Sequence, residues 1–227
     1  MFAKLKMLGV AAAAIVLMAA PATAATVIDF TTGFAGEGGT ISWDGSNLIG
    51  SNIPIGAVSI TGAPTNNGVF AVSGMSTGQG GGMYGTLNFD TAADLISISG
   101  CIPGLSIGLD ANGNCAPVDL MSGTFTSYSA TANGLLNAFG EDMKNTDLMN
   151  AINWPTDLPW EFFGVSITTG GLNPDGTPGS VISTDIRNTA VPEPATMRLL
   201  GTGLLAAFRA RRRQARASCP SLEGERR

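Results

Sequence analysis

The feature that most constrains the fold is a succession of short β-prone runs, separated by turn residues, between residues 25 and 190. Glycine supplies 27 of these 166 residues, about double its ordinary share, and Thr, Ser and Asn are abundant. Nine runs have this character: Thr26–Phe30, Thr40–Trp43, Ala57–Thr61, Gly68–Val72, Thr86–Phe89, Leu95–Ser99, Met121–Tyr128, Phe162–Thr168 and Val181–Ile186. Many short strands at this spacing predict an all-β domain, and we expect an antiparallel β-sandwich.

One segment, at about residues 132–154, departs from this pattern because it holds most of the helix-compatible residues. The positions of Leu135, Phe139 and Met143 fit one helical face, and Pro155 would end a helix before the next strand. We therefore expect a short helical insertion that crosses between strands and covers an open end of the sandwich.

The N-terminus has the parts of an export signal. Two lysines precede an apolar run from Leu8 to Ala20, and Ala22 and Ala24 provide the small residues that a signal peptidase requires. The run is shorter than the roughly 20 residues that span a bilayer. We expect residues 1–24 to form a signal helix that is cleaved after Ala24 or one residue later.

Charge separates the body of the chain from its two basic ends. Residues 25–190 contain fourteen acidic and two basic residues, which gives a net charge of −12. A surface of this sign repels phosphate backbones, so we expect no binding to nucleic acid. It suits cations, and it also suits a well-solvated soluble domain.

Cysteine usage agrees with export. Residues 25–190 contain Cys101 and Cys115, and the segment between these two is rich in Gly, Pro and Asn. In an oxidising compartment we expect them to form one disulfide that closes a surface loop. Reduced thiols or metal ligands remain the alternative. Cys219 lies beyond the C-terminal arginines, and we expect it to take no part in the mature fold.

The composition argues against catalysis. The chain contains no histidine, so it lacks the base of Ser-His-Asp and Cys-His sites and the commonest transition-metal ligand. A pair of carboxylates would still permit hydrolytic chemistry, but no pair stands out among the scattered acidic residues. We expect no enzymatic activity and no cofactor, with Ca²⁺ as the one candidate metal ion.

The calcium candidate is a short polar segment between the two cysteines. Asp110, Asn112 and Asn114 offer oxygen atoms at alternate positions, as a calcium-binding loop does. A full loop of that kind also has a glycine at its sixth position and a distal bidentate glutamate. Here the glycine comes fourth and the glutamate is missing, so a solvated turn is the competing interpretation.

The C-terminal tail has the composition of a sorting signal. Val191 is followed by Pro192, Glu193 and Pro194, an extended element that lacks two amide donors and is accessible to a protease. An apolar segment follows, which we expect to form a hydrophobic helix. A cluster of arginines then favours the cytoplasmic side of a membrane: Arg209, Arg211, Arg212 and Arg213.

This tail resembles the PEP-CTERM sorting domain of exported proteins from Gram-negative bacteria. The resemblance covers roughly residues 190–213, which we divide into a sorting segment at 191–213 and an atypical, disordered extension at 214–227. It implies export, transient retention at the inner membrane, and recognition of the Pro-Glu-Pro element by an exosortase-type transpeptidase. It also implies delivery to the cell surface or extracellular matrix, often in bacteria that make exopolysaccharide.

Two functions of different class remain open for residues 25–190. The first is a non-enzymatic surface or matrix protein that acts through packing and adhesion. The second is a carbohydrate- or calcium-binding β-sandwich module that uses the acidic loops and a set of aromatic residues, namely Trp43, Tyr84, Trp154 and Trp160. Aromatic residues of this kind either stack on sugars or pack within the core.

Overall fold

The computed structural model describes residues 25–78, 81–131, 135–156, 160–170 and 179–190. The chain divides into two compact units, Met1–Val191 and Pro192–Arg227, and all described residues belong to the first. The predicted signal helix and the predicted C-terminal hydrophobic helix lie outside the described residues. None of the helices within the described ranges is long and apolar enough to cross a membrane.

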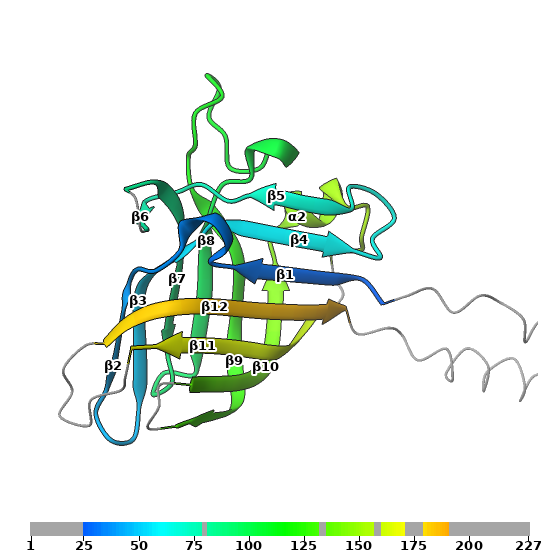
Figure 1. The fold of residues 1–227 in the computed structure, drawn as a ribbon. Helices are drawn as coiled ribbons and strands as arrows, with labels where there is room; N and C mark the ends of the chain where they lie inside the picture. Colours follow the sequence, from blue (N-terminus) through cyan, green and yellow to red (C-terminus); the bar gives the residue numbers. More distant parts are fainter. Residues whose placement is uncertain (1–24, 79–80, 132–134, 157–159, 171–178, 191–227) are drawn as a thin grey trace, which may run out of the picture. The chain divides into compact units, whose positions relative to one another are not determined.

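The described residues form twelve strands and one short α-helix (Figure 1). The strands are β1 (Val27–Thr31), β2 (Thr40–Trp43), β3 (Leu48–Ile55), β4 (Ala57–Thr61), β5 (Gly68–Ala71), β6 (Ser76–Thr77), β7 (Met83–Asp90), β8 (Leu95–Gly100), β9 (Val118–Ala130), β10 (Leu135–Lys144), β11 (Trp160–Thr169) and β12 (Gly179–Ala190). The helix α2 (Thr146–Ala151) follows β10 directly, and two 3₁₀ turns cover Gly33–Ala35 and Pro103–Leu105. Each of the nine predicted runs coincides with a strand.

The strands pair antiparallel and close into an eight-stranded barrel. The order is β11, β10, β9, β8, β7, β3, β2 and β12, and pairing between β11 and β12 completes the ring. The sheet forks at β12, because its first residues pair with β2 and its later residues pair with β1. Strands β4 and β5 continue the second branch, and this branch is stacked above β12 in Figure 1.

Alternation of apolar and polar residues sets which side of each strand faces the core. In β8, Ile96 and Ile98 are buried, whereas Leu95 is exposed and the serines between them are half-buried. The large ring of Phe89 fits inside because Gly50 lies opposite it in β3: a Cβ there would lie 2.0 Å from a ring carbon. A one-residue register slip would turn every such side chain to the other face, so this pattern fixes the pairing.

The helix α2 contributes to the same core rather than standing apart from it. Leu148, Met149 and Ile152 are buried, and the Ala151 carbonyl accepts hydrogen bonds from side chains of the β4–β5 connection. Asn145 caps the helix by accepting a hydrogen bond from the Asp147 amide at 2.8 Å. The contacts explain how six residues remain helical although so short a helix has little stability of its own.

Two expectations about the fold need correction. The all-β, antiparallel class is confirmed, but the sheet closes on itself instead of forming two packed layers. Among the described residues of the predicted helical insertion at 132–154, Leu135–Lys144 is a strand, and α-helix is confined to Thr146–Ala151. Pairing with β9 and β11 on both sides overrides the helical spacing of the apolar residues, because two ladders of hydrogen bonds outweigh local propensity.

Candidate functional site

The sequence-predicted processing residues lie outside the described residues. This holds for the signal-cleavage residues Ala22 and Ala24, for the recognition element at 191–194, and for the arginine cluster at 209–213. The structure therefore informs on the body of the protein, which begins immediately after the expected signal cleavage and ends immediately before the sorting element.

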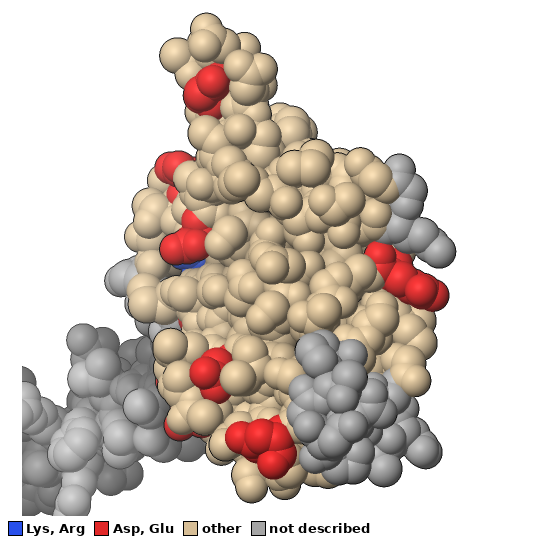
Figure 2. Space-filling model, turned by 90° about the vertical axis from the view of Figure 1, so that its left-hand side faces the viewer, with Lys and Arg blue, Asp and Glu red and all other residues tan. Residues whose placement is uncertain are grey.

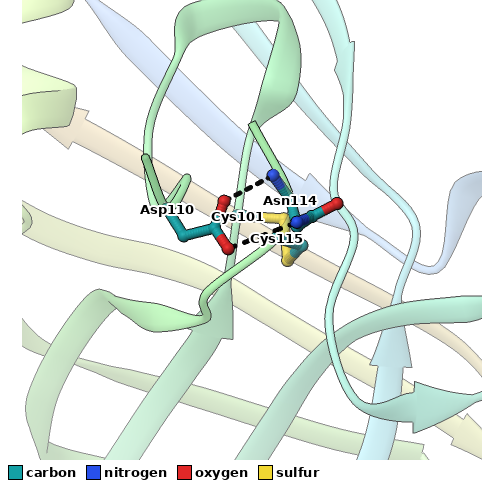
Figure 3. The surroundings of a disulfide bond; sticks show 4 residues. All are labelled: Cys101, Asp110, Asn114 and Cys115. Carbon is teal, nitrogen blue, oxygen red and sulfur yellow. Dashed lines mark hydrogen bonds between the residues drawn. A yellow bond between two sulfur atoms is a disulfide. The ribbon is translucent and has the colours of Figure 1, made fainter. Parts of the chain in front are cut away.

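Cys101 and Cys115 form a disulfide with an S–S distance of 2.02 Å and a Cα–Cα distance of 5.7 Å. Cys101 is fully buried at the end of β8, whereas Cys115 lies in an exposed segment. The bond therefore closes the loop at 101–115, in which Ile102 and Ile107 are buried in the core and residues 110–115 are exposed (Figure 3).

The calcium candidates lie in this loop, but their geometry is that of a self-satisfied turn. Asp110 Oδ1 accepts hydrogen bonds from the amides of Asn112 and Asn114 at 2.9 and 2.8 Å. Asp110 Oδ2 accepts a further bond from the Asn114 side-chain amide at 3.3 Å (Figure 3). These bonds hold the pKa of the Asp110 carboxyl below its ordinary value, because they favour its charged form. The solvated turn is the interpretation that these bonds favour, and calcium binding at this loop remains an untested alternative.

The predicted aromatic set does not form one platform. Trp160 is buried in the core and packs against Trp154, with ring centroids 5.9 Å apart and planes inclined by 57°. Trp43 is half-buried against the core, and Tyr84 donates a hydrogen bond to the Phe34 carbonyl at 3.4 Å. Packing accounts for these rings better than a shared sugar surface does.

A buried polar cluster, which sequence reasoning missed, lies against Trp160. It consists of Asp142 and Lys144 from β10 and Asn188 from β12, and we call it the Lys144 cluster. The Lys144 Nζ pairs with Asp142 Oδ1 and donates a hydrogen bond to Asn188 Oδ1 at 3.1 Å. It also lies 5.3 Å from the centroid of the Trp160 ring. The side chains of Asp142 and Lys144 have no exposed surface, and Asn188 is equally buried.

Burial decides the protonation behaviour of this cluster. It lowers the pKa of Lys144 to about 8, against the opposing charge of Asp142, and it raises the pKa of the Asp142 carboxyl, against the opposing charge of Lys144. Among the described residues, Asp142 Oδ2 has no hydrogen-bond partner. The Lys144 amine and the Asp142 carboxylate therefore compete for one proton, in surroundings from which solvent is excluded.

A pair of carboxyl groups, Asp29 and Asp185, lies on β1 and β12. Asp29 forms a hydrogen bond with Asp185, and Arg187 lies opposite Asp29 in the strand register. Burial, this hydrogen bond and the charge of Asp185 raise the pKa of Asp29 to about 7, while Arg187 opposes the shift. Because two hydrogen-bonded carboxyl groups of like charge cannot both ionise freely, Asp29 retains a proton up to nearly neutral pH.

The outer faces of neighbouring strands carry two shallow hollows of about 430 Å³ each. They adjoin, because Leu95, Ser122 and Gly123 line both. Hydroxyl, amide and carboxylate groups surround exposed apolar side chains there: Ser51, Asn88, Asp90, Ser97, Thr124 and Glu141 around Ile49, Leu95 and Met143. We call this surface the outer face of β3 and β7–β10.

Acidic side chains dominate the exposed charge. On the side of the molecule that Figure 2 shows, acidic residues are spread over the surface and only a trace of a basic residue is visible. This agrees with the charge pattern of the sequence and with a surface that stays solvated.

The comparisons with known proteins match the tail alone. The model of the PEP-CTERM protein-sorting motif matches residues 190–213. The chain therefore carries this motif, which indicates an exported protein that an exosortase-type system directs to the cell surface. No curated protein and no solved structure matches the chain.

Proposed function

We propose that this exosortase-directed chain is a non-enzymatic structural or adhesive protein of the cell surface or extracellular matrix. The observation that carries the proposal is the sorting motif at 190–213, attached to a closed, well-packed domain. A barrel has few free strand edges, so a secreted copy resists uncontrolled edge-to-edge association. The disulfide further suits a domain that works outside the cell.

The proposed route begins with cleavage by signal peptidase after Ala24. The C-terminal segment then holds the protein transiently at the inner membrane of a Gram-negative host, with Arg209–Arg213 on the cytoplasmic side. The transpeptidase recognises Pro192, Glu193 and Pro194 and releases the domain to the surface, where exopolysaccharide is the expected neighbour. The extended Pro-Glu-Pro backbone offers such an enzyme a segment with no competing secondary structure.

The test is to determine both ends of the protein in its fractionated host. The surface or extracellular fraction should contain a product that begins near Ala25 and ends near Pro194. Glu193→Ala should block release, whereas Glu141→Ala, which removes an exposed acid from β10, should leave it unchanged. Full-length protein that ends at Arg227 and stays in the cytoplasm would refute the route.

A second candidate is carbohydrate binding, and the outer face of β3 and β7–β10 favours it. Hydroxyl and amide groups there lie beside exposed apolar side chains. The polar groups can form hydrogen bonds with sugar hydroxyls, and the apolar side chains can pack against the C–H surface of a sugar ring. The carboxylates of Asp90 and Glu141 would repel an acidic polymer, so a neutral polysaccharide is the proposed ligand. Asn88→Ala should weaken retention on a neutral polysaccharide, and Ser59→Ala in β4 should not. Equal retention of both variants and the parent would remove this candidate.

A further inference from the structure

The Lys144 cluster brings an amine and a carboxamide together in fixed orientation. Lys144 Nζ lies 3.1 Å from Asn188 Oδ1, one bond away from the amide carbon. The Asn188 amide cannot turn freely, because its Nδ2 donates to the carbonyls of Ile28 and Ile186 at 3.1 and 2.9 Å. Asp142 contacts the same amine. A nucleophile, an electrophile and an acid–base group therefore meet at one point.

The surroundings favour the reactive forms of these groups. An amine attacks only when it is neutral, and burial moves the pKa of Lys144 down to about 8 while it moves that of Asp142 up. The Trp160 ring lies against the amine and keeps water away from it. Asp142 Oδ2, which lacks a partner within the described ranges, is free to carry a proton.

We propose that Lys144 and Asn188 condense in the folded protein to form an intramolecular amide bond, with Asp142 as the proton carrier. Asp142 takes a proton from Lys144, and the neutral Nζ attacks Cγ of Asn188. The new Nζ–Cγ bond forms, the Cγ–Nδ2 bond breaks, and Nδ2 leaves as ammonia with one proton that came from the lysine. The fold holds the amine beside the amide carbon, which lowers the entropic part of the activation barrier. The reaction requires no oxidant, metal or co-reactant.

The bond would connect strands that do not pair with each other. β11 lies between β10 and β12, and the register places Trp160 opposite Asp142 on one side and Ala190 on the other. The link would cross the inner side of β11 and join the residue just before α2 to the last strand, which would close residues 144–188 into a covalent loop. A chain closed in this way unfolds less completely, because the unfolded state loses conformational freedom.

The test is the mass of the reduced, denatured wild-type protein purified from its host, read as the intact chain and as peptides. The amide would lower the mass by about 17 Da, in a branched peptide that contains Lys144 and Asn188. Lys144 is the only lysine after residue 6, so amine-reactive labelling of the denatured protein reports on it directly. A labelled Lys144 and a full sequence mass would overturn the proposal. So would a loss of about 18 Da mapped to Asp142, since that is the water lost by a lysine–aspartate amide.

Variants separate the chemistry from the charge. Lys144→Arg keeps a cation but has no nucleophilic amine at neutral pH, so it should show the full mass. Asp142→Asn should also show it, because the proton carrier is gone. Asp147→Asn changes an exposed acid three residues from Lys144, and it should retain the deficit. Retention of the deficit in Lys144→Arg would place the modification elsewhere and contradict the assignment.

Discussion

The loop at 101–115 and the Lys144 cluster use the same residue types in opposite ways. In the loop, Asp110 is fully exposed and takes every hydrogen bond from residues two to four positions away. In the barrel, Lys144 depends on Asn188, which is 44 positions away. The pKa of the Asp110 carboxyl is lowered, and that of the Asp142 carboxyl is raised. Polar groups in the loop are satisfied locally, whereas those inside rely on the completed fold.

The largest effect on stability is expected from a substitution in the buried Lys144 cluster. Lys144→Met removes the nitrogen that Asp142 contacts, whether as an amine or as the condensed amide, and should lower the free energy of unfolding by about 3–5 kcal/mol, because a buried carboxyl remains without its partner. Urea unfolding of wild type and variant measures the difference. The double variant Asp142→Leu/Lys144→Met should recover much of the loss, since it removes both charges. A single variant as stable as wild type would show that the cluster is not a buried pair.

The next largest effect on stability is expected from loss of the disulfide between Cys101 and Cys115. Cys115→Ser opens a loop of sequence separation 14 and should cost about 3 kcal/mol through the entropy of the unfolded chain. Cys115 is the suitable position because it is exposed, whereas a hydroxyl at the buried Cys101 would add a second penalty. Thermal unfolding measures the effect, and the reduced wild-type protein is the matched control. Reduction without any shift in midpoint would mean that the loop is not held by this bond.

The same contrast explains what the sequence predicts and what it does not. The nine β-prone runs and the cysteine loop depend on neighbouring residues, so pattern and turn chemistry find them. Strand β3 was not predicted, because Gly50 and Pro54 interrupt its apolar pattern, and Gly50 is required by a ring in another strand. Strand β10 was predicted as helix because its apolar residues also fit helical spacing, and only pairing with β9 and β11 excludes the helix.

The Lys144 cluster could not be derived in the same way. From the sequence, a single lysine in an acidic domain is expected to be a solvated surface charge. Asn188 is expected to be an ordinary polar residue near the sorting motif. Their meeting depends on the inward register of β10 and β12. The barrel closure is equally non-local, since it rests on pairing between β11 and β12 and on the fork at β12. The available signal was the alternation of Asp142 and Lys144 on one face, once β10 is known to be a strand.

A smaller effect is expected at the half-buried Asp29, whose pKa is raised to about 7. Between pH 4 and pH 7 the folded protein holds a proton that the unfolded chain has lost, so this group favours folding less as the pH rises through that window. Asp29→Asn should therefore flatten the fall of the melting temperature between pH 5 and pH 7.5. Asp44→Asn, at an exposed carboxylate whose pKa is lowered, serves as the control. An identical pH profile for wild type and Asp29→Asn would contradict the raised pKa.

The smallest effect is expected at Asp110, on the loop side. Its folded pKa is lowered, so its contribution is present above the unfolded value of 3.8 and disappears as the pH falls through the folded value. Asp110→Ala should leave the global unfolding midpoint almost unchanged at pH 7, because water satisfies an exposed turn. It should instead speed hydrogen exchange at the Asn112 and Asn114 amides, while the amides of β8 and β9 keep their protection. Equal loss of protection in the loop and in the strands would mean that the loop folds together with the barrel, and the distinction between a local and a fold-dependent network would fail at this point.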